Sequence, residues 1–403
     1  MSNPSRKPIV VIALVTAVCM LGNEMLFIVM PLYWKSFGLT SLWQVGVLLS
    51  ANRIIRIPIN SLVGWCYQRI GKRLGIIAAV VLAAVSTFSY GMVKGFWLLL
   101  IARCLWGIAW SFFRIGGYLT ILSSSKPETR GQFVGLYNGL WGLGTLFGML
   151  FGGLLSELIG IQTVTVLFSI LAISSIPFIL RFINNTREEI PQVNKKKDFM
   201  IWKNKRIVTS FITGLIVAFV VYGVFASTLS KLIELQMSII IGLTIGAGTI
   251  TGFIQALRTG WDPFLAPYLG RISDQKWGRI PILILALLAA AVCLSLFSLK
   301  LPMVLFIALI LLFQLTTTVL ITMSDSIAAD FAAGPLQITV ITFYTLFSDI
   351  GAALGPLLGF VMMDVFGIQS LYWLSSFIIV PLAVYWFIIF KKEVRMTGQM
   401  EGQ

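Results

Sequence analysis

The stretch Gly144-Thr145-Leu146-Phe147-Gly148-Met149-Leu150-Phe151-Gly152-Gly153 has a counterpart 207 residues later in Gly351-x-x-x-Gly355-Pro356-x-x-Gly359. The same spacing joins Gly160 to Gly367, Glu157 to Asp364 and Tyr137 to Tyr344. A fixed internal period of this length indicates a duplicated structural unit. Both copies lie in strongly apolar sequence, so the duplicated unit is predicted to be a membrane one. Two homologous halves are typical of secondary transporters, whose binding site lies between the halves.

The composition supports a membrane protein throughout the chain. Of its 403 residues 58% are hydrophobic and 11% are charged, which is too apolar for a single soluble core. Runs of about 20 apolar residues are long enough to cross a bilayer. Twelve such spans are predicted, at residues 9–31, 43–66, 74–91, 96–122, 132–155, 163–180, 207–229, 239–268, 281–298, 302–323, 338–362 and 370–390.

Basic residues concentrate in alternate loops. With the N-terminus placed inside, the outward loops hold only Lys35, Lys94, Lys231 and Lys300, and most other Lys and Arg lie in inward loops and termini. This asymmetry follows the positive-inside rule and predicts that both termini are cytoplasmic. Together with the short termini, it predicts a multi-pass protein of the plasma (inner) membrane of a bacterium.

Several function classes are disfavoured by what the sequence lacks. It contains no histidine, which removes His-based metal sites and general bases. No Gly-x-x-x-x-Gly-Lys-Ser/Thr loop is present to bind ATP. The net charge of +15 is explained by the inward loops and is not a nucleic-acid signal. We therefore expect no enzyme, cofactor or metal, and a monomer whose partners are the lipid bilayer, a small-molecule substrate and protons.

One polar break divides the chain. Residues 181–206 follow the sixth span and are rich in Lys and Arg. The predicted organisation is an N-terminal six-helix bundle at 1–180, a cytoplasmic linker at 181–206, and a C-terminal six-helix bundle with a short tail at 207–403. The linker is interpreted as a solvated segment facing lipid headgroups, with a regulatory role as the alternative.

Two tight inward turns carry related motifs. The first is Gly64-Trp65-Cys66-Tyr67-Gln68-Arg69-Ile70-Gly71-Lys72-Arg73, and the second is Gly270-Arg271-Ile272-Ser273-Asp274-Gln275-Lys276-Trp277-Gly278-Arg279. Both resemble the Gly-x-Leu-Ala-Asp-Arg-x-Gly-Arg-Lys loop of the major facilitator superfamily, which follows helices two and eight. The elements Gly64, Gly71 and Arg73 match it in the first turn, and Gly270, Asp274, Gly278 and Arg279 match it in the second.

Further motifs extend the resemblance over essentially the whole chain. Arg103-x-x-Trp106-Gly107 is similar to the family's Arg-x-x-x-Gly motif in helix four, and the Gly144–Gly153 stretch is similar to the Gly-x-x-x-Gly-Pro-x-x-Gly-Gly motif of its antiporters. Leu21-Gly22 followed by Pro31-Leu32-Tyr33 is similar to the start of the drug-efflux group. The sequence departs from the family at Gln68, where the loop motif has an acid, and at Met149, where the antiporter motif has proline. Pro356 carries that proline in span eleven instead.

The resemblance implies an all-α membrane fold of twelve helices in two pseudo-symmetric six-helix bundles, working by alternating access. The glycines add a physical reason for close packing, because residues four apart share one helix face and form a smooth stripe. Spans five and eleven are therefore expected to pack closely on a partner helix from the same or the opposite half. The two interpretations are a purely structural contact and a seal that slides during transport.

Ionisable residues within the spans are candidates for the transport site, because a charge at bilayer depth costs about 2.5–3.5 kcal/mol even on the most lenient scale. The candidates are Glu24, Arg53, Arg56, Arg103, Arg114, Arg258, Asp262 and Asp349. Arg258 and Asp262 are four residues apart and are able to pair. Glu24 is the expected partner of Arg53 and Arg56. The other possibility for each residue is a direct role in binding.

The balance of these charges is five bases against three acids, which suits a substrate with a carboxylate, a phosphate or a similar anionic group. Glu24, Asp262 and Asp349 are the candidates for a proton-binding carboxylate. The predicted function is export of a small amphipathic organic compound by proton antiport. The alternatives are proton-coupled uptake or facilitated diffusion of an organic anion and, more remotely, a non-transporting scaffold or sensor.

Overall fold

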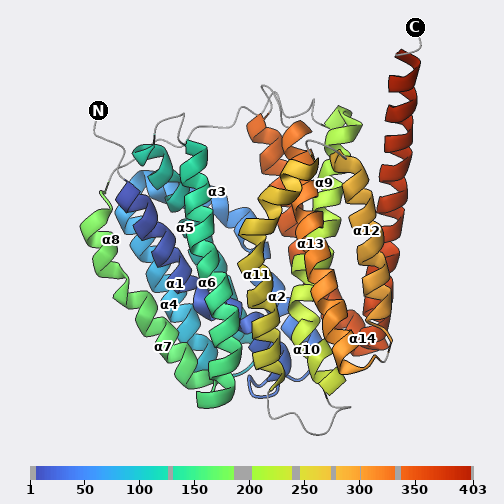
Figure 1. The fold of residues 1–403 in the computed structure, drawn as a ribbon. Helices are drawn as coiled ribbons and strands as arrows, with labels where there is room; N and C mark the ends of the chain where they lie inside the picture. Colours follow the sequence, from blue (N-terminus) through green and yellow to red (C-terminus); the bar gives the residue numbers. More distant parts are fainter. Residues whose placement is uncertain are drawn as a thin grey trace. The chain divides into compact units, whose positions relative to one another are not determined.

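The computed structural model of the chain describes residues 6–125, 130–185, 202–237, 246–273, 278–299, 301–331 and 337–400. These residues form helices of varied length, most of them joined by short turns (Figure 1). They divide into two compact units, one made of Met1–Gln192 with Ser227–Gly260 and the other of Val193–Ala226 with Trp261–Gln403. The sequence predicts that the linker at 181–206 separates the two six-helix halves. Most of this linker lies outside the described residues, so the boundary stays a prediction.

The first unit contains the helices up to the linker. They are α1 (Arg6–Leu32), α2 (Leu42–Ile54), α3 (Arg56–Ile70), α4 (Lys72–Met92), α5 (Phe96–Ser124), α6 (Arg130–Ile159), α7 (Ile161–Ser174) and α8 (Ile176–Phe182). Nearly all of α10 (Ala226–Met237) and the first part of α11 (Ala247–Ile272) also belong to this unit.

The second unit holds α9 (Lys205–Ala218), the π-helical segment η3 (Phe219–Phe225), the rest of α11, α12 (Arg279–Leu296), α13 (Met303–Phe331) and α14 (Gln337–Met400). The last of these is two helices that meet at Gly367, where φ is 81°. Only glycine adopts such a backbone angle without strain.

The predicted twelve-helix architecture is confirmed. Nine stretches of the described residues are long and apolar enough to cross a membrane, and the stretch Val340–Lys392 holds two helices. Two expected spans are not among the nine. Span two is broken into helices of 13 and 15 residues, and span eight is α11, which carries Arg258, Asp262 and two prolines.

Proline explains the break in span two. Pro58 lacks an N–H, so the carbonyl of Ile54 four residues earlier loses its helical partner and α2 ends there. The break at Ile55 faces α5, because a Cβ added at Gly107 would lie 3.1 Å from the backbone carbonyl carbon of Asn52. Gly107 lies in α5, which is the fourth predicted span. Because Gly107 has no side chain, α5 is able to approach span two closely at its break.

The backbone repeats with the period found in the sequence. Gly71 and Gly278 have φ of 83° and 74°, and Gly160 and Gly367 have φ of 83° and 81°. Each pair is 207 residues apart and each glycine starts the following helix. The duplication therefore fixes the same left-handed turns in both copies.

Both glycine stripes pack on the first helix of their own copy. A Cβ on Gly148 would lie 2.9 Å from the Leu21 carbonyl oxygen in α1, and one on Gly355 would lie 2.6 Å from the Phe219 carbonyl oxygen in η3. Gly144 and Gly351 lie one turn earlier and press on the Ala17 and Leu215 carbonyls in the same way. At these positions the partner is in the same half, whereas Gly153 of the first stripe packs on the backbone of Gly248 in α11, which belongs to the opposite half of the sequence.

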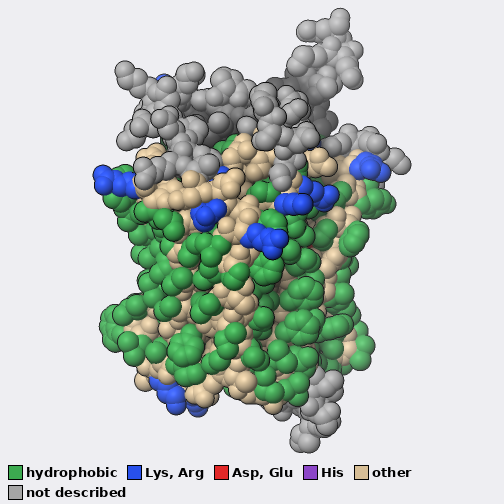
Figure 2. All heavy atoms as spheres, turned by 90° about the vertical axis from the view of Figure 1, so that its left-hand side faces the viewer, with side chains coloured by type: hydrophobic (Ala, Val, Ile, Leu, Met, Phe, Trp, Pro, Cys, Tyr) green, Lys and Arg blue, Asp and Glu red, His purple; other side chains and the backbone are tan. Residues whose placement is uncertain are grey.

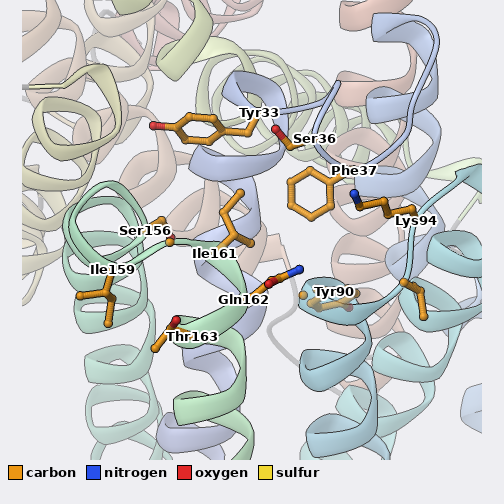
Figure 3. A pocket seen from close by; sticks show the side chains of 13 residues that line it. Tyr33, Ser36, Phe37, Tyr90, Lys94, Ser156, Ile159, Ile161, Gln162 and Thr163 are labelled. Carbon is orange, nitrogen blue, oxygen red and sulfur yellow. The ribbon is translucent and has the colours of Figure 1, made fainter.

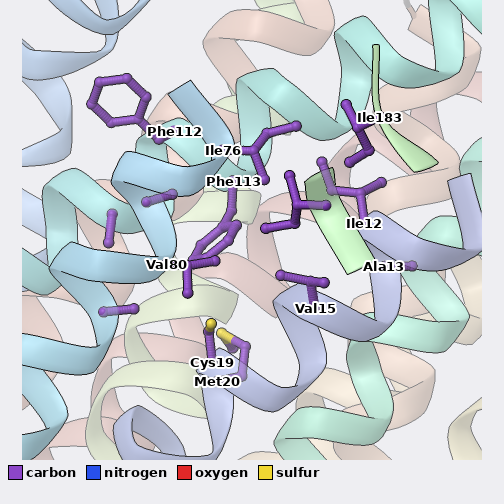
Figure 4. Close-up of a cluster of buried hydrophobic side chains, with 14 of the residues drawn as sticks. Ile12, Ala13, Val15, Cys19, Met20, Ile76, Val80, Phe112, Phe113 and Ile183 are labelled. Carbon is purple, nitrogen blue, oxygen red and sulfur yellow. The ribbon is translucent and has the colours of Figure 1, made fainter. Parts of the chain in front are cut away.

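The first unit has its core where α1, α4 and α5 meet. Cys19 and Met20 from α1 lie against Val80 of α4 and Phe113 of α5 (Figure 4). In the face shown in Figure 2, hydrophobic side chains form a continuous band with Lys and Arg gathered at its two margins. This is the surface expected of a protein whose sides contact lipid and whose ends contact headgroups.

Candidate functional site

Arg103 of α5 is the most deeply buried charge in the first unit, with 0% of its surface exposed. Its Nε donates to the carbonyl of Leu48 at 2.9 Å, and its Nη1 donates to Oδ1 of Asn23 at 2.8 Å. A longer bond of 3.5 Å joins Nη2 to the carbonyl of Leu49. The ring of Tyr90 lies on another side, with its centroid 5.9 Å from the guanidinium carbon. The fork of donors thus joins α5 to α1 and α2.

Asn23 connects this arginine to the buried acid of span one. Its amide nitrogen donates to Oε1 of Glu24 at 2.8 Å, and its oxygen also accepts from Nδ2 of Asn52 at 3.2 Å. The positive charges of Arg53, Arg103 and Arg56 all act on the Glu24 carboxylate. The acid and its expected arginine partners therefore lie in one polar cluster, which Asn23 and Asn52 complete and which the sequence did not reveal.

Arg56 faces an aromatic pair. Its guanidinium carbon lies 5.3 Å from the ring centroid of Trp110, and Trp110 meets Trp141 edge to face at 5.2 Å. A cation over an indole face is attracted by the ring quadrupole. Asn138 accepts a hydrogen bond of 3.1 Å from the Trp141 ring nitrogen and has an exposed side chain. Together these residues form a cationic and aromatic surface.

The opposite faces of α6 differ in packing. A Cβ added at Gly135, Gly139 or Gly142 would meet no atom within 4 Å. At about 100° of rotation per residue, these positions lie opposite the Gly144 and Gly148 stripe. One face of α6 therefore packs on α1, and the opposite face is open at these three glycines.

The second unit carries the candidate acids Asp262 and Asp349. The Thr318 hydroxyl of α13 donates to Oδ1 of Asp262 at 2.6 Å, and the Trp261 ring nitrogen donates to the same hydroxyl at 3.3 Å. Asp349 is half-buried in α14. Arg258 is buried in α11, in the part of that helix that belongs to the first unit. The roles of these three residues stay predictions.

Two acids escaped the sequence-based search. Asp325 of α13 accepts a hydrogen bond of 2.7 Å from the Tyr344 hydroxyl, but it lies beyond the residue at which span ten was expected to end. Glu157 was noticed only as the repeat partner of Asp364. Its carboxylate accepts from the backbone N–H of Gly248 at 2.8 Å, and from the backbone and hydroxyl of Thr249. It therefore holds the first turn of α11 against the end of α6.

The two turns that carry the related loop motifs make equivalent contacts. Nζ of Lys72 donates to the Ser123 hydroxyl at 2.6 Å, and Arg279 forms an ion pair with Asp330. Both members of the second pair lie 207 residues after those of the first. Arg73 adds a bond from its Nε to the carbonyl of Ile183. Asp274 of the second turn lies outside the described residues.

A cavity of about 390 Å³ opens at the other end of the first unit, among the turns after α1, α4 and α6 (Figure 3). Tyr33, Tyr90, Lys94, Ser156 and Gln162 lie around it. Burial raises the pKa of the Tyr33 phenol, and the charges of Glu157 and Glu234 raise it further, so Tyr33 is neutral at physiological pH. Tyr90 lines this cavity, and its ring also lies beside the Arg103 guanidinium.

The sequence matches the family profile described as Major Facilitator Superfamily over residues 12–261 and 263–399. The chain belongs to the major facilitator superfamily. Membership makes it a multi-pass membrane protein and a secondary transporter, and not an enzyme. The resemblance found in its loop and helix motifs is confirmed.

Relatives of this facilitator match nearly its whole length. An uncharacterized MFS-type transporter of Methanocaldococcus jannaschii is 23% identical over 380 residues, covering 92% of this chain and 95% of the relative. The multidrug resistance protein MdtG of Salmonella arizonae is 24% identical over 374 residues, covering 88% of each.

Solved structures of other transporters share the fold. A bacterial homolog of the human lysosomal transporter Spinster, in an inward-facing and occupied conformation, has a TM-score of 0.79 at 16% identity and covers 97% of this chain and 98% of its own. The nucleoside transporter NupG has a TM-score of 0.78 at 14% identity, with 96% and 99% covered. At these identities the similarity shows only that this chain has the same fold as these transporters.

Proposed function

We propose that this transporter exports a small amphipathic organic compound with an anionic group, by proton antiport and alternating access. The observation that carries the proposal is the cluster of Arg56, Trp110 and Trp141, in which the guanidinium lies over one indole and the second indole meets the first edge to face. The two indoles suit the apolar part of an amphipathic compound, and the guanidinium suits a carboxylate or a phosphate, whose geometry its fork of donors matches.

Arg103 has a different part in this proposal. All three of its side-chain nitrogens donate to protein oxygens, on Leu48, Leu49 and Asn23. It is therefore assigned to positioning Glu24 and the broken span two. Arg56 is assigned to the substrate because its guanidinium lies over Trp110, and Arg53, three residues earlier in the same span, is assigned with it. With these assignments, Arg53 and Arg56 supply the net positive charge expected for binding an anionic ligand.

Export is favoured over uptake by a sequence relative. MdtG is named as a multidrug resistance protein, and the glycine pattern of α6 is similar to that of antiporters in the family. Proton coupling would use one of the buried or half-buried carboxylates Glu24, Asp262 and Asp349. One observation favours the second candidate, proton-coupled uptake or facilitated diffusion of an organic anion: Met149 stands where the antiporter motif has proline.

The proposed substrate charge is tested by comparing two arginines that each face a tryptophan. Arg56→Ala removes the buried pair with Trp110, and Arg69→Ala removes the exposed pair of Arg69 and Trp65, whose separation is 4.5 Å. In competition assays with a panel of amphipathic anions and cations, Arg56→Ala should weaken the apparent affinity for anions about tenfold or more, as expected for a hydrogen bond to a charged group. Arg69→Ala should leave it unchanged. Equal effects of the two variants, or a cation as the best substrate, would contradict the proposed charge.

A further inference from the structure

A groove at the basic end of the second unit remains unused by the proposed transport. It has a volume of about 480 Å³ and lies between α9 and the last helical segment of α14. Its walls are formed mainly by Val208, Ile212 and Ile216 on one side and by Ile378, Pro381 and Tyr385 on the other. The groove is thus apolar over most of its length.

The groove is held open by its own packing. The Trp386 ring nitrogen donates to the Thr213 hydroxyl at 2.9 Å, which ties the last helix to α9. At the mouth, Trp202 packs on Phe211 and Phe343 with ring centroids 6.1 and 5.4 Å away. These contacts fix both walls, so the groove exists before any ligand arrives.

Its polar groups are confined to one end. Thr209 lines the groove, but its hydroxyl already donates to the carbonyl of Lys205 at 2.7 Å. Lys205 lines the groove at the end where α9 begins, and the exposed Lys203 precedes it by two residues. Tryptophan and lysine together are typical of the level of the lipid headgroups. A cation therefore stands at the headgroup end and an apolar channel runs toward the membrane centre.

We propose that this groove binds an anionic phospholipid, with its phosphate on Lys205 and Lys203 and one acyl chain along α9. Moving an acyl chain from bilayer to groove exchanges one apolar surrounding for another, so the chain contributes fit and little selectivity. Selection comes from the headgroup, because each lysine near the membrane surface strengthens the binding of an anionic lipid about fivefold. The proposal does not depend on the substrate or on the direction of transport.

Native mass spectrometry of the purified full-length protein tests this site. Phosphatidylglycerol and phosphatidylcholine with the same acyl chains are titrated separately. The wild type should bind one phosphatidylglycerol much more tightly than phosphatidylcholine. Lys203→Gln combined with Lys205→Gln should weaken that binding about twentyfold, from two factors of about five. The matched control, Lys391→Gln with Lys392→Gln, removes two exposed lysines outside the groove and should change it less than twofold.

A groove-filling variant separates the acyl site from the charged end. Ile212 is 44% exposed, so Ile212→Trp should insert and fold normally while it occupies the space of the chain. It should abolish the tight phosphatidylglycerol site although every lysine is kept. The proposal is overturned by equal binding of the two lipids, by unchanged binding in the lysine variant, or by a lysine-dependent site that survives Ile212→Trp.

Discussion

Arg103 shows how one side chain organises the polar interior of the first unit. Its donors reach two backbone carbonyls of α2 and the oxygen of Asn23, and this set of three needs a planar fork. A lysine ammonium keeps the charge but is a compact point donor on a flexible stem. The bonds lost are charge-assisted and buried, so their loss is costly.

We predict that Arg103→Lys lowers the rate of transport at least tenfold and lowers the stability of the detergent-purified protein by about 2 kcal/mol, on the scale of one or two lost bonds to a charged group. Initial transport rates and thermal unfolding are the measurements. Since Arg103 is assigned to positioning, the apparent affinity for substrate should change less than the maximal rate. A normal transport rate and normal stability in this variant would contradict the positioning role of Arg103.

At the scale of single residues, the sequence showed which charged residues lie within the spans but not which polar residues form hydrogen bonds with them. Glu24, Arg53 and Arg56 share one region because they lie on consecutive spans, and Arg103 of the fourth span joins them through its hydrogen bond to Asn23. Asn23 was missed because an asparagine next to a membrane-embedded glutamate carries no signal of its own. Its amide becomes meaningful only once α5 brings Arg103 to its oxygen.

At the scale of helices, the glycine stripes set how near two backbones lie. A Cβ on Gly148 would already stand 3.0 Å from the Glu24 Cβ and 2.9 Å from the Leu21 carbonyl oxygen. A larger side chain must push α6 away from α1, and inserting bulk into a well-packed contact costs about 1–3 kcal/mol or more.

We therefore predict that Gly148→Leu, and equally Gly355→Leu in the second copy, abolishes transport while the protein still inserts in the membrane. The matched control is Leu143→Trp on the same helix, because the Leu143 side chain is 38% exposed and has room for added bulk. Substrate flux and membrane expression are measured for all three. Normal flux in both stripe variants would reduce the stripes to incidental composition.

The contact between Glu157 and the start of α11 is a second helix-scale feature. A carboxylate that accepts from first-turn N–H groups is stabilised by the positive end of the helix. If α6 and α11 separate during transport, this contact must break. We predict that Glu157→Gln, which keeps the shape and removes the charge, favours the separated form.

The test uses Thr249→Cys in a background without the four native cysteines. Labelling by a membrane-impermeant thiol reagent is compared with and without Glu157→Gln. Glu157→Gln should increase the labelling rate several-fold. An unchanged or lower rate would show that the carboxylate does not restrain α11.

Much of the helix arrangement was accessible from the sequence, and its gaps have physical causes. The two loop motifs predicted tight turns at Gly71 and Gly278, and both glycines adopt a left-handed backbone angle. The break of span two at Ile55 was not predicted, although Pro58 gave the signal. The π-helical segment η3 was not predicted from the sequence. Its Gly223 packs closely on Gly355, and this contact leaves no local pattern in the sequence.

At the scale of the whole molecule, the orientation in the membrane is a prediction of the distribution of Lys and Arg. Cys66 is half-buried near the end of α3, at the inward turn. A membrane-impermeant thiol reagent should therefore label it in inside-out vesicles and not in intact cells. Lys35→Cys, in an expected outward loop, is the matched control and should label from outside. The reverse pattern would invert the proposed orientation.

Flux into proteoliposomes under an imposed pH gradient is the most direct test of proton-coupled movement of an amphipathic organic anion. The purified protein is reconstituted around a pH-sensitive dye, and a panel of labelled amphipathic anions is supplied. We predict that an anion accumulates against its gradient, that protons move the opposite way, and that a protonophore abolishes accumulation. We also predict that one of Glu24→Gln, Asp262→Asn and Asp349→Asn abolishes accumulation but leaves downhill exchange intact. Anion accumulation that ignores the pH gradient, or that stays gradient-driven in all three variants, would contradict these predictions.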